Sequence, residues 1–216
     1  MTVAEVGSIS WPRVVGDTTY NLYVRRCPDG ESFVEVAETT PADLLPALLR
    51  DLQSRVLPPP TPVFEALDPE FGWAYVRTPL DFRAGDNSWR EMSVSASAGP
   101  VWATVTATPT VLTFDPGDPN GEGPVSCRGT AATAPYVPEL PGECSFTFTN
   151  ASSTSEHDGY HFLTTMSIQW TITWTSSGGG AGSFDPYTTS TTAELAVAEV
   201  KGLVTFTGPR SSQGGC

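Results

Sequence analysis

One stretch in the C-terminal half limits the possible folds of this chain more than any other. Between Tyr160 and Thr175, large apolar side chains occupy almost every second position. A period of two places apolar residues on one face of a β-strand, so the pattern predicts a long strand with one buried face. The segment exceeds a usual strand in length, and we therefore expect a bulge near residues 164–165. Leu163 has the opposite parity to the apolar set, which is Phe162, Met166, Ile168, Trp170, Ile172 and Trp174.

Shorter alternating segments surround this strand. Threonine dominates their polar positions, which suits strands with one face toward water. Pro109 is expected to separate the first two segments, because proline interrupts strand pairing. Short strands divided by turns are typical of a sandwich. We therefore predict a mainly β fold with an antiparallel immunoglobulin-like β-sandwich in the C-terminal half. Its further strands are expected over residues 101–108, 111–115, 145–149, 188–197 and 198–207.

The N-terminal half predicts a small α+β region with one helix. Residues 20–26 and 32–37 flank an Asp-Gly turn and indicate a hairpin. Thr40 and Asp43 have the spacing of a capping box, and a proline stands at the first helical position. Leucines at helical spacing then predict one apolar stripe on a helix over residues 41–56.

Two features follow this helix. The proline run at 57–62 is expected to be an extended spacer, with a ligand for a proline-binding domain as the alternative. Residues 71–82 have strand character, which would place Phe71, Trp73 and Tyr75 on one face. We expect these aromatic side chains to pack on the leucine stripe, because a lone helix needs a partner. The alternative is that they line an exposed ligand-binding face.

These patterns divide the chain into three parts. Residues 1–100 form an N-terminal α+β region with a hairpin, one helix and a proline-rich connector. Residues 101–207 form the sandwich, and residues 208–216 form a flexible tail rich in Gly and Ser.

The acidity of the chain excludes several classes of partner. Its formal net charge is −13, from 11 Lys and Arg against 24 Asp and Glu. Nucleic acids and anionic membrane surfaces bind clustered basic residues, so neither is expected as a partner. No apolar run reaches the length of about 18 residues that indicates a transmembrane helix. Residues 1–20 lack the basic and apolar regions of a signal peptide, so a secreted form is expected to be a processed chain.

The four cysteines indicate an oxidising compartment. Cys127 and Cys144 flank a loop of 16 residues that is rich in Pro and Gly, and a disulfide between them would hold this loop. The alternative is a pair of reduced thiols in a cytosolic protein. Cys27 and Cys216 would pair only if the chain ends meet, and Cys216 could instead stay reduced or join two chains. The spacing of the four does not indicate a metal site.

One acidic loop is a candidate calcium site. Asp115, Asp118, Asn120 and Glu122 offer oxygen atoms on a turning backbone, which is the ligand type that calcium prefers. The alternative is a solvated acidic turn, since the loop also contains Pro and several Gly residues. No other cofactor is expected.

Other candidate site residues are few. Trp89 and Trp102 are candidate contact residues for a binding surface, because aromatic side chains dominate such surfaces; the alternative is packing between the two halves. His157 and His161 would lie about 13 Å apart on a strand, so we expect no metal between them. No nucleophile elbow or phosphate-binding loop occurs, and no catalytic residue is predicted.

The C-terminal half resembles a known family. Residues 112–118 (LTFDPGD), 145–149 (SFTFT) and 158–170 (DGYHFLTTMSIQW) look like a polycystic-kidney-disease-type domain, whose fold resembles an immunoglobulin sandwich. The tryptophan that usually precedes the first turn is absent here, and a cysteine-flanked insert follows that turn. The whole chain also resembles a group of secreted actinobacterial proteins, in which Arg25, Arg26, Cys27, Asp29, Gly30 and the helix Asp43–Leu49 match.

These resemblances imply a secreted or cell-envelope location and a non-enzymatic role. The leading expectation is a secreted or cell-surface binding and structural module, with a protein or a glycan as its partner. A subunit of an extracellular assembly, such as a pilus or a phage-like particle, is the alternative. A hydrolase that acts on the envelope is a third interpretation, which would require a pocket with clustered carboxylates. The oligomeric state is not predicted.

Overall fold

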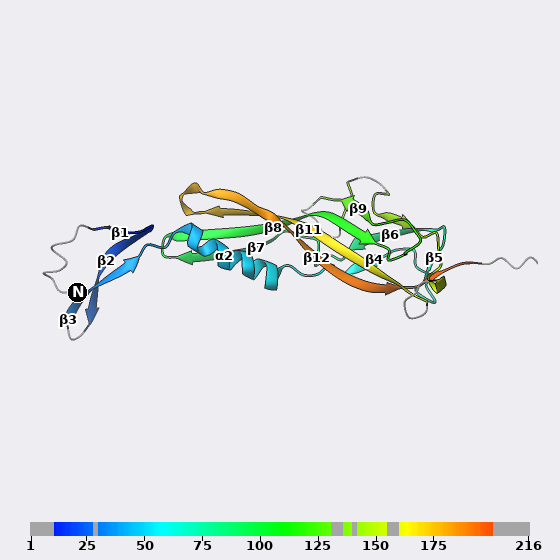
Figure 1. The fold of residues 1–216 in the computed structure, drawn as a ribbon, viewed down its shortest axis with the longest axis horizontal. Helices are drawn as coiled ribbons and strands as arrows, with labels where there is room; N and C mark the ends of the chain where they lie inside the picture. Colours follow the sequence, from blue (N-terminus) through cyan, green and yellow to red (C-terminus); the bar gives the residue numbers. More distant parts are fainter. Residues whose placement is uncertain (1–10, 28–29, 131–135, 140–141, 155–159, 201–216) are drawn as a thin grey trace, which may run out of the picture. The chain divides into compact units, whose positions relative to one another are not determined.

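The chain forms a mainly β, antiparallel, sandwich-like fold with a single α-helix among the described residues, as the sequence predicts (Figure 1). This computed structural model describes residues 11–27, 30–130, 136–139, 142–154 and 160–200. They fall into two compact units that are interleaved along the sequence. The first unit comprises the residues up to Val56, Met92–Ala107 and Ile172–Asp185; the second comprises Leu57–Glu91, Thr108–Thr171 and the residues from Pro186.

Three long strands contribute residues to both units. They are β8 (Val101–Asp115), β11 (Phe162–Ser176) and β12 (Ala181–Leu195). The predicted boundary between residues 100 and 101 falls at the tip of a hairpin between β7 (Met92–Ala98) and β8, whose register pairs Ala98 with Val101. That residues 1–100 fold as a separate region stays a prediction.

The first unit contains a three-stranded sheet with the order β1-β2-β3. The predicted hairpin is confirmed, as β2 (Thr18–Cys27) and β3 (Gly30–Ala37) pair antiparallel. Strand β1 (Arg13–Val15) pairs antiparallel with the start of β2. No residue of this sheet whose side chain is described is fully buried.

The predicted helix is confirmed together with its start. Helix α2 spans Pro41–Asp51, and the backbone N–H and hydroxyl of Thr40 both donate to Asp43 Oδ2, at 2.7 and 2.8 Å. The chain continues as the π-helical turn η1 (Leu52–Val56). Leu48 and Leu52 are buried, and α2 and η1 both contact β7. The leucine stripe therefore has a sheet partner within the first unit.

The strand character expected over residues 71–82 is confirmed in part, because two strands lie there and not one. They are β5 (Ala74–Tyr75) and β6 (Pro79–Ala84), which the second unit contains together with β4 (Pro62–Phe64). A turn separates β5 from β6, in which Thr78 N–H donates to the Tyr75 carbonyl at 3.3 Å and Arg77 has a φ of 62°. Strand β6 is the middle strand of a sheet with the order β10-β6-β4, where β10 is Ser145–Thr147.

Pro109 does not end a strand, so the expectation that it separates a strand over 101–108 from one over 111–115 is wrong. Strand β8 runs through it, in a five-stranded sheet ordered β12-β11-β8-β7, where β9 (Val125–Arg128) also pairs with β8. Pairing with β7 ends at Ala107, and pairing with β9 begins at Val111. Pro109 therefore lies between two partners, where the proline's missing N–H leaves no ladder bond with either.

Strand β11 supplies the core of the second unit. Every even-numbered residue from Phe162 to Trp170 is buried, so the alternation continues without the bulge expected near 164–165. Phe162 stacks on Phe148 with 5.5 Å between ring centroids, and Phe146 meets Phe148 edge-on at 4.8 Å. Leu163 is exposed, as its parity predicts.

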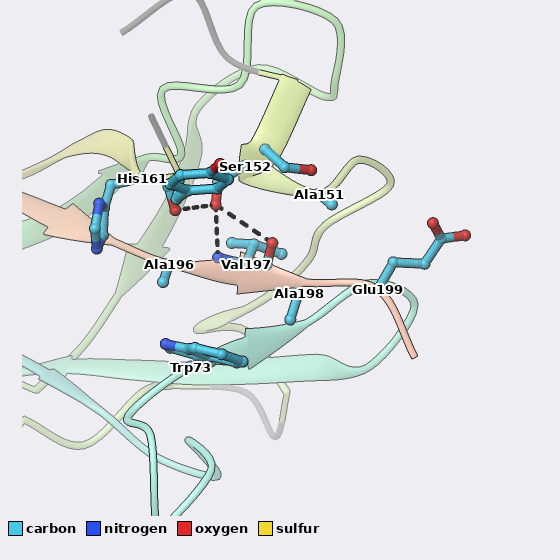
Figure 2. Close-up of a pocket in the computed structure, with 10 residues that line it drawn as sticks. Trp73, Ala151, Ser152, His161, Ala196, Val197, Ala198 and Glu199 are labelled. Atoms are coloured by element: carbon cyan, nitrogen blue, oxygen red, sulfur yellow. Dashed lines mark hydrogen bonds between the residues drawn. The ribbon is translucent and has the colours of Figure 1, made fainter. Parts of the chain in front are cut away.

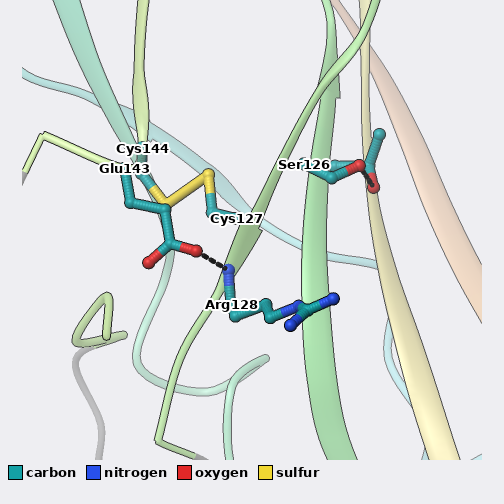
Figure 3. The surroundings of a disulfide bond; sticks show 6 residues. Ser126, Cys127, Arg128, Glu143 and Cys144 are labelled. Carbon is teal, nitrogen blue, oxygen red and sulfur yellow. Dashed lines mark hydrogen bonds between the residues drawn. A yellow bond between two sulfur atoms is a disulfide. The ribbon is translucent and has the colours of Figure 1, made fainter. Parts of the chain in front are cut away.

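The disulfide between Cys127 and Cys144 is confirmed (Figure 3). Cys127 lies on β9 and Cys144 directly precedes β10, with 5.4 Å between their Cα atoms. Arg128 N–H donates to Glu143 Oε1 at 2.8 Å, and the Arg128 carbonyl accepts from Glu139 N–H at 3.0 Å. The described residues at the end of the loop between Cys127 and Cys144 are thus joined to β9 by hydrogen bonds as well as by the disulfide.

Removing this disulfide should lower the free energy of unfolding. On the chain-entropy model, a bridge across 17 positions contributes about 3 kcal/mol by restricting the unfolded chain. We expect that loss in a variant with both Cys127→Ser and Cys144→Ser, measured by urea unfolding. Intact mass with and without reductant should differ by about two mass units for this bridge. An unchanged unfolding curve in the double variant would contradict the prediction.

Candidate functional site

The candidate site is built on the one parallel strand pair among the described residues, in the second unit. Strand β13 (Val197–Ala198) pairs with β5, so that Val197 lies beside Ala74 and Ala198 beside Tyr75. Ala74 N–H donates to the Ala196 carbonyl at 2.9 Å, and Val76 N–H to that of Ala198 at 3.0 Å. Ala74 and Val197 are buried. Since side chains alternate along a strand, Trp73 and Tyr75 point to the opposite face.

A tight loop before β5 holds Trp73 in place. Asp68 Oδ1 accepts hydrogen bonds from the N–H groups of Glu70 and Phe71, both at 2.9 Å. Asp68 Oδ2 accepts from the Tyr75 hydroxyl at 2.6 Å, and the Asp68 N–H donates to the Trp73 carbonyl at 2.8 Å. One carboxylate therefore connects both ends of the loop.

Phe71 and Trp73 form an exposed aromatic pair on this loop. Their rings stack with 4.7 Å between centroids and 25° between planes, while 54% of Phe71 and 40% of Trp73 stay exposed. The alternative interpretation of the aromatic pattern, an exposed face, therefore describes these two side chains. Tyr75 is half-buried and bonds to Asp68.

The Asp68 contacts shift two pKa values in opposite directions. The Tyr75 hydroxyl, followed by the Phe71 and Glu70 N–H groups, lowers the pKa of Asp68, because hydrogen bonds to a carboxylate favour its charged form. The same bond raises the pKa of Tyr75, because the Asp68 carboxylate accepts the hydroxyl proton of Tyr75 in a hydrogen bond and so favours the neutral phenol. At neutral pH the pair is therefore a charged acceptor and a neutral donor.

Trp73 lines a pocket of about 550 Å³, within the range of small-molecule sites (Figure 2). Its second aromatic wall is Tyr160, whose side chain is 71% exposed. Small residues, Ala151, Ala196 and Ala198, leave room between the walls. Among the described residues, the polar side chains that line the pocket are Ser152, Ser153, His161 and Glu199.

Ser152 anchors the pocket from within the protein. It is buried, and its hydroxyl accepts a bond from Val197 N–H at 3.0 Å. The Tyr160 carbonyl accepts from the same hydroxyl, and the Val197 carbonyl lies 3.3 Å away. Tyr160 has a φ of 88°, a conformation that costs free energy for a residue other than glycine. The Ser152 bond helps to hold it there.

The serine, histidine and acid of this pocket do not form a catalytic triad. A nucleophilic serine needs its hydroxyl within hydrogen-bond reach of a base. The Ser152 hydroxyl is engaged with backbone groups, and Figure 2 shows His161 and Glu199 on opposite sides of it. The three residues share a pocket without the geometry of acyl transfer.

The binding-surface prediction is wrong for Trp89. This side chain is fully buried in the second unit, where its Nε1–H donates to the Thr130 carbonyl at 3.2 Å. The Tyr136 ring meets it edge-on with 4.3 Å between centroids. Burial of a large aromatic with a satisfied N–H is a core role.

Trp102, the second predicted contact residue, lies on the surface of the first unit. Its side chain is 44% exposed, and its backbone N–H donates to the Ser177 hydroxyl at 3.1 Å. Trp102 does not line the pocket at Trp73. A contact role for Trp102 stays a prediction.

Two carboxylates of the acidic loop bond to nearby N–H groups, and a calcium site there stays a prediction. Asp115 Oδ1 accepts from Gly117 N–H, and Asp118 Oδ1 accepts from Asn120 N–H, both at 3.0 Å. Asp118 Oδ2 accepts from the Asn150 side chain, also at 3.0 Å. These bonds are those of turns, and within the described ranges no three His, Cys, Asp or Glu side chains are grouped so that they could hold a metal. Glu122 does not join them.

Some predicted residues lie outside the described part of the chain. These are His157, Cys216 and the side chain of Cys27, so neither the histidine pair nor the pairing of the outer cysteines is described. The predicted strand over 198–207 is described only to residue 200, and the tail at 208–216 is not described.

Comparisons with known proteins give no relative for this arrangement. No protein-family model, curated protein or solved structure matches the chain. The polycystic-kidney-disease-type resemblance therefore stays a prediction, as does the likeness to secreted actinobacterial proteins.

Acid should release the Trp73 loop only below the ordinary aspartate pKa. Because folding lowers the pKa of Asp68, its stabilising contribution is complete above about pH 4 and is lost as the pH falls through the lower folded value. We expect the NMR indole signal of Trp73 to keep its position down to about pH 4 and to move below it. In Asp68→Asn, which cannot accept both sets of bonds, the signal should differ at every pH. Identical acid titrations for the two proteins would contradict this assignment.

Proposed function

We propose that this chain is a non-enzymatic, secreted or cell-surface binding module whose ligand contacts the pocket between Trp73 and Tyr160. The observation that carries the proposal is a large exposed aromatic surface held rigidly beside a cavity of about 550 Å³. Aromatic residues supply much of the free energy of binding at recognition surfaces. Binding costs little conformational entropy in this loop, because the Asp68 hydrogen bonds fix it before a ligand binds.

The disulfide supports an extracellular location. Structural disulfides persist in oxidising compartments and are rare in the cytosol. No helix in the described part of the chain is long and apolar enough to cross a membrane. The net charge of −13 disfavours nucleic acid and anionic lipid as partners.

Two features favour binding over catalysis. Glycoside hydrolysis usually needs two carboxylates across the bond to be cleaved, and Glu199 is the one carboxylate among the described residues that line the pocket. The hydroxyl of Ser152 is buried and engaged with the backbone. The hydrolase interpretation is therefore less well supported than binding.

Binding to intact cells tests this proposal. Fluorescently labelled protein should bind cells of the organism that encodes it, and Trp73→Ala should weaken that binding by about tenfold or more, which corresponds to about 1.4 kcal/mol. The proposal places the ligand at Trp73 and not at Trp102, which is similarly exposed but does not line the pocket, so Trp102→Ala is the comparison variant and should bind like the wild type. Circular dichroism should show both variants folded. Binding that survives Trp73→Ala and fails in Trp102→Ala would contradict the assignment of the site.

A subunit of an extracellular assembly is the second candidate, favoured by the sheet β1-β2-β3. Val14, Val15, Tyr23, Val24 and Val34 are exposed on it, and apolar surface of this kind is commonly covered by a partner. Tyr23 lies opposite Val34 in the register, so the two share one face.

This second candidate predicts association of the chain with itself. Analytical ultracentrifugation should then show oligomers at micromolar concentration, whereas Tyr23→Thr with Val34→Thr should be monomeric and folded, because threonine suits strands. Leu163→Thr, at an exposed site on β11, is the control and should associate like the wild type. A wild-type chain that stays monomeric would contradict self-assembly through this sheet.

A further inference from the structure

We infer that the pocket at Trp73 binds uncharged pyranose sugars, as part of a glycan on a cell surface. This inference rests on the proposed binding function and names its ligand class. A pyranose ring is amphipathic, because its C–H bonds form an apolar face while its hydroxyl groups point outward from the ring edge. A site for such a ring needs a flat aromatic surface, space beside it, and hydrogen-bonding groups around it.

The indole of Trp73 provides the flat surface. The π face of an aromatic ring carries negative charge density, which attracts weakly positive C–H groups. Phe71 stacks against Trp73 and stiffens this surface, while 40% of the tryptophan stays exposed. The bonds of Asp68 fix both ends of the loop, so the surface exists before the ligand binds.

The space beside Trp73 suits one or two sugar rings. The pocket volume is about 550 Å³, and its second aromatic wall is Tyr160. Alanines line the strand that faces this space, and Figure 2 shows Trp73 beside the strand that bears Ala196 and Ala198. Larger side chains at these two positions would fill the space that the ring needs.

The charges around the pocket disfavour acidic sugars. The described residues that line the pocket include Glu199 but no lysine or arginine, and the chain carries a net charge of −13. A carboxylate or phosphate on the ligand would therefore meet no basic side chain among the described lining residues, in a chain whose net charge is negative. Neutral hydroxyl groups meet no such cost, and the exposed side chain of Ser153 lines the pocket, where it can bond to them.

The main competing ligand is an organic cation. Aromatic faces also attract quaternary ammonium groups, and such sites usually surround the cation with several rings. Among the described residues that line this pocket two are aromatic, and the others are Val197, three alanines and polar residues. This composition favours a flat ring with a polar edge over a compact cation.

Saturation-transfer difference NMR with defined oligosaccharides tests the inference. The neutral probes are tetrasaccharides of glucose, mannose, xylose and N-acetylglucosamine, and tetragalacturonic acid and tetramethylammonium are the charged probes. We expect transfer to the ring C–H protons of at least one neutral probe, and none to the charged probes. Trp73→Ala should weaken binding at least tenfold, Trp73→Phe should retain part of it, and Trp102→Ala should bind like the wild type.

Treated cells separate this inference from the proposed function. Periodate, which destroys sugar rings, should abolish cell binding, whereas protease treatment of the cells should not. Cell binding that depends on Trp73 but resists periodate, with no oligosaccharide bound, would overturn the sugar ligand and leave the binding function standing. Binding of tetramethylammonium alone would also overturn the sugar ligand. If neither cells nor probes are bound, both proposals fail.

Discussion

The buried face of β11 is the constraint on which the second unit depends. Its even-numbered side chains form the core, and two of them also bond to β12: Thr164 Oγ1 donates to the Ala193 carbonyl at 2.8 Å, and Trp170 Nε1–H donates to Thr189 Oγ1 at 3.0 Å. These bonds fix the register of β12, and β13 follows after one residue. The position of β13 beside β5 then sets where Trp73 stands. The exposed pocket thus depends on a strand whose own side chains are buried.

Local patterns predicted the elements well and their partners poorly. The alternation in β11, the Thr40 cap and the Cys127–Cys144 bridge all follow from rules that act over a few residues or a short loop. The pairing of β5 with β13 joins residues more than a hundred positions apart through two residues of each strand. A strand pair that short has no periodicity to detect, so the sequence could indicate the aromatic triplet at Phe71, Trp73 and Tyr75 without its counterpart at Val197.

Trp89 and Pro109 show why residue type alone was insufficient. A tryptophan fits an interface or a core equally well, and what decides between them is whether a partner can accept its N–H. The Thr130 carbonyl does so for Trp89. Proline ends a strand only where a neighbouring strand needs its N–H, and on the side of β7 and β9 the partners change at Pro109. Both outcomes depend on neighbours distant in sequence.

The pocket exists because small and large side chains stand on the same face of a two-stranded pair. Where strands pack in the core, Leu195 and Val197 fill the space on the buried side. On the opposite side Trp73 extends beyond its neighbours Ala196 and Ala198, and the difference in their size leaves the hollow. Natural cores avoid such differences because an unfilled cavity costs stability. Here the hollow opens to water, so it carries no such cost, and the tryptophan that borders it is held rigid by a carboxylate with three hydrogen bonds. A rigid aromatic wall beside water contributes little to folding, which supports the proposal that it binds a ligand.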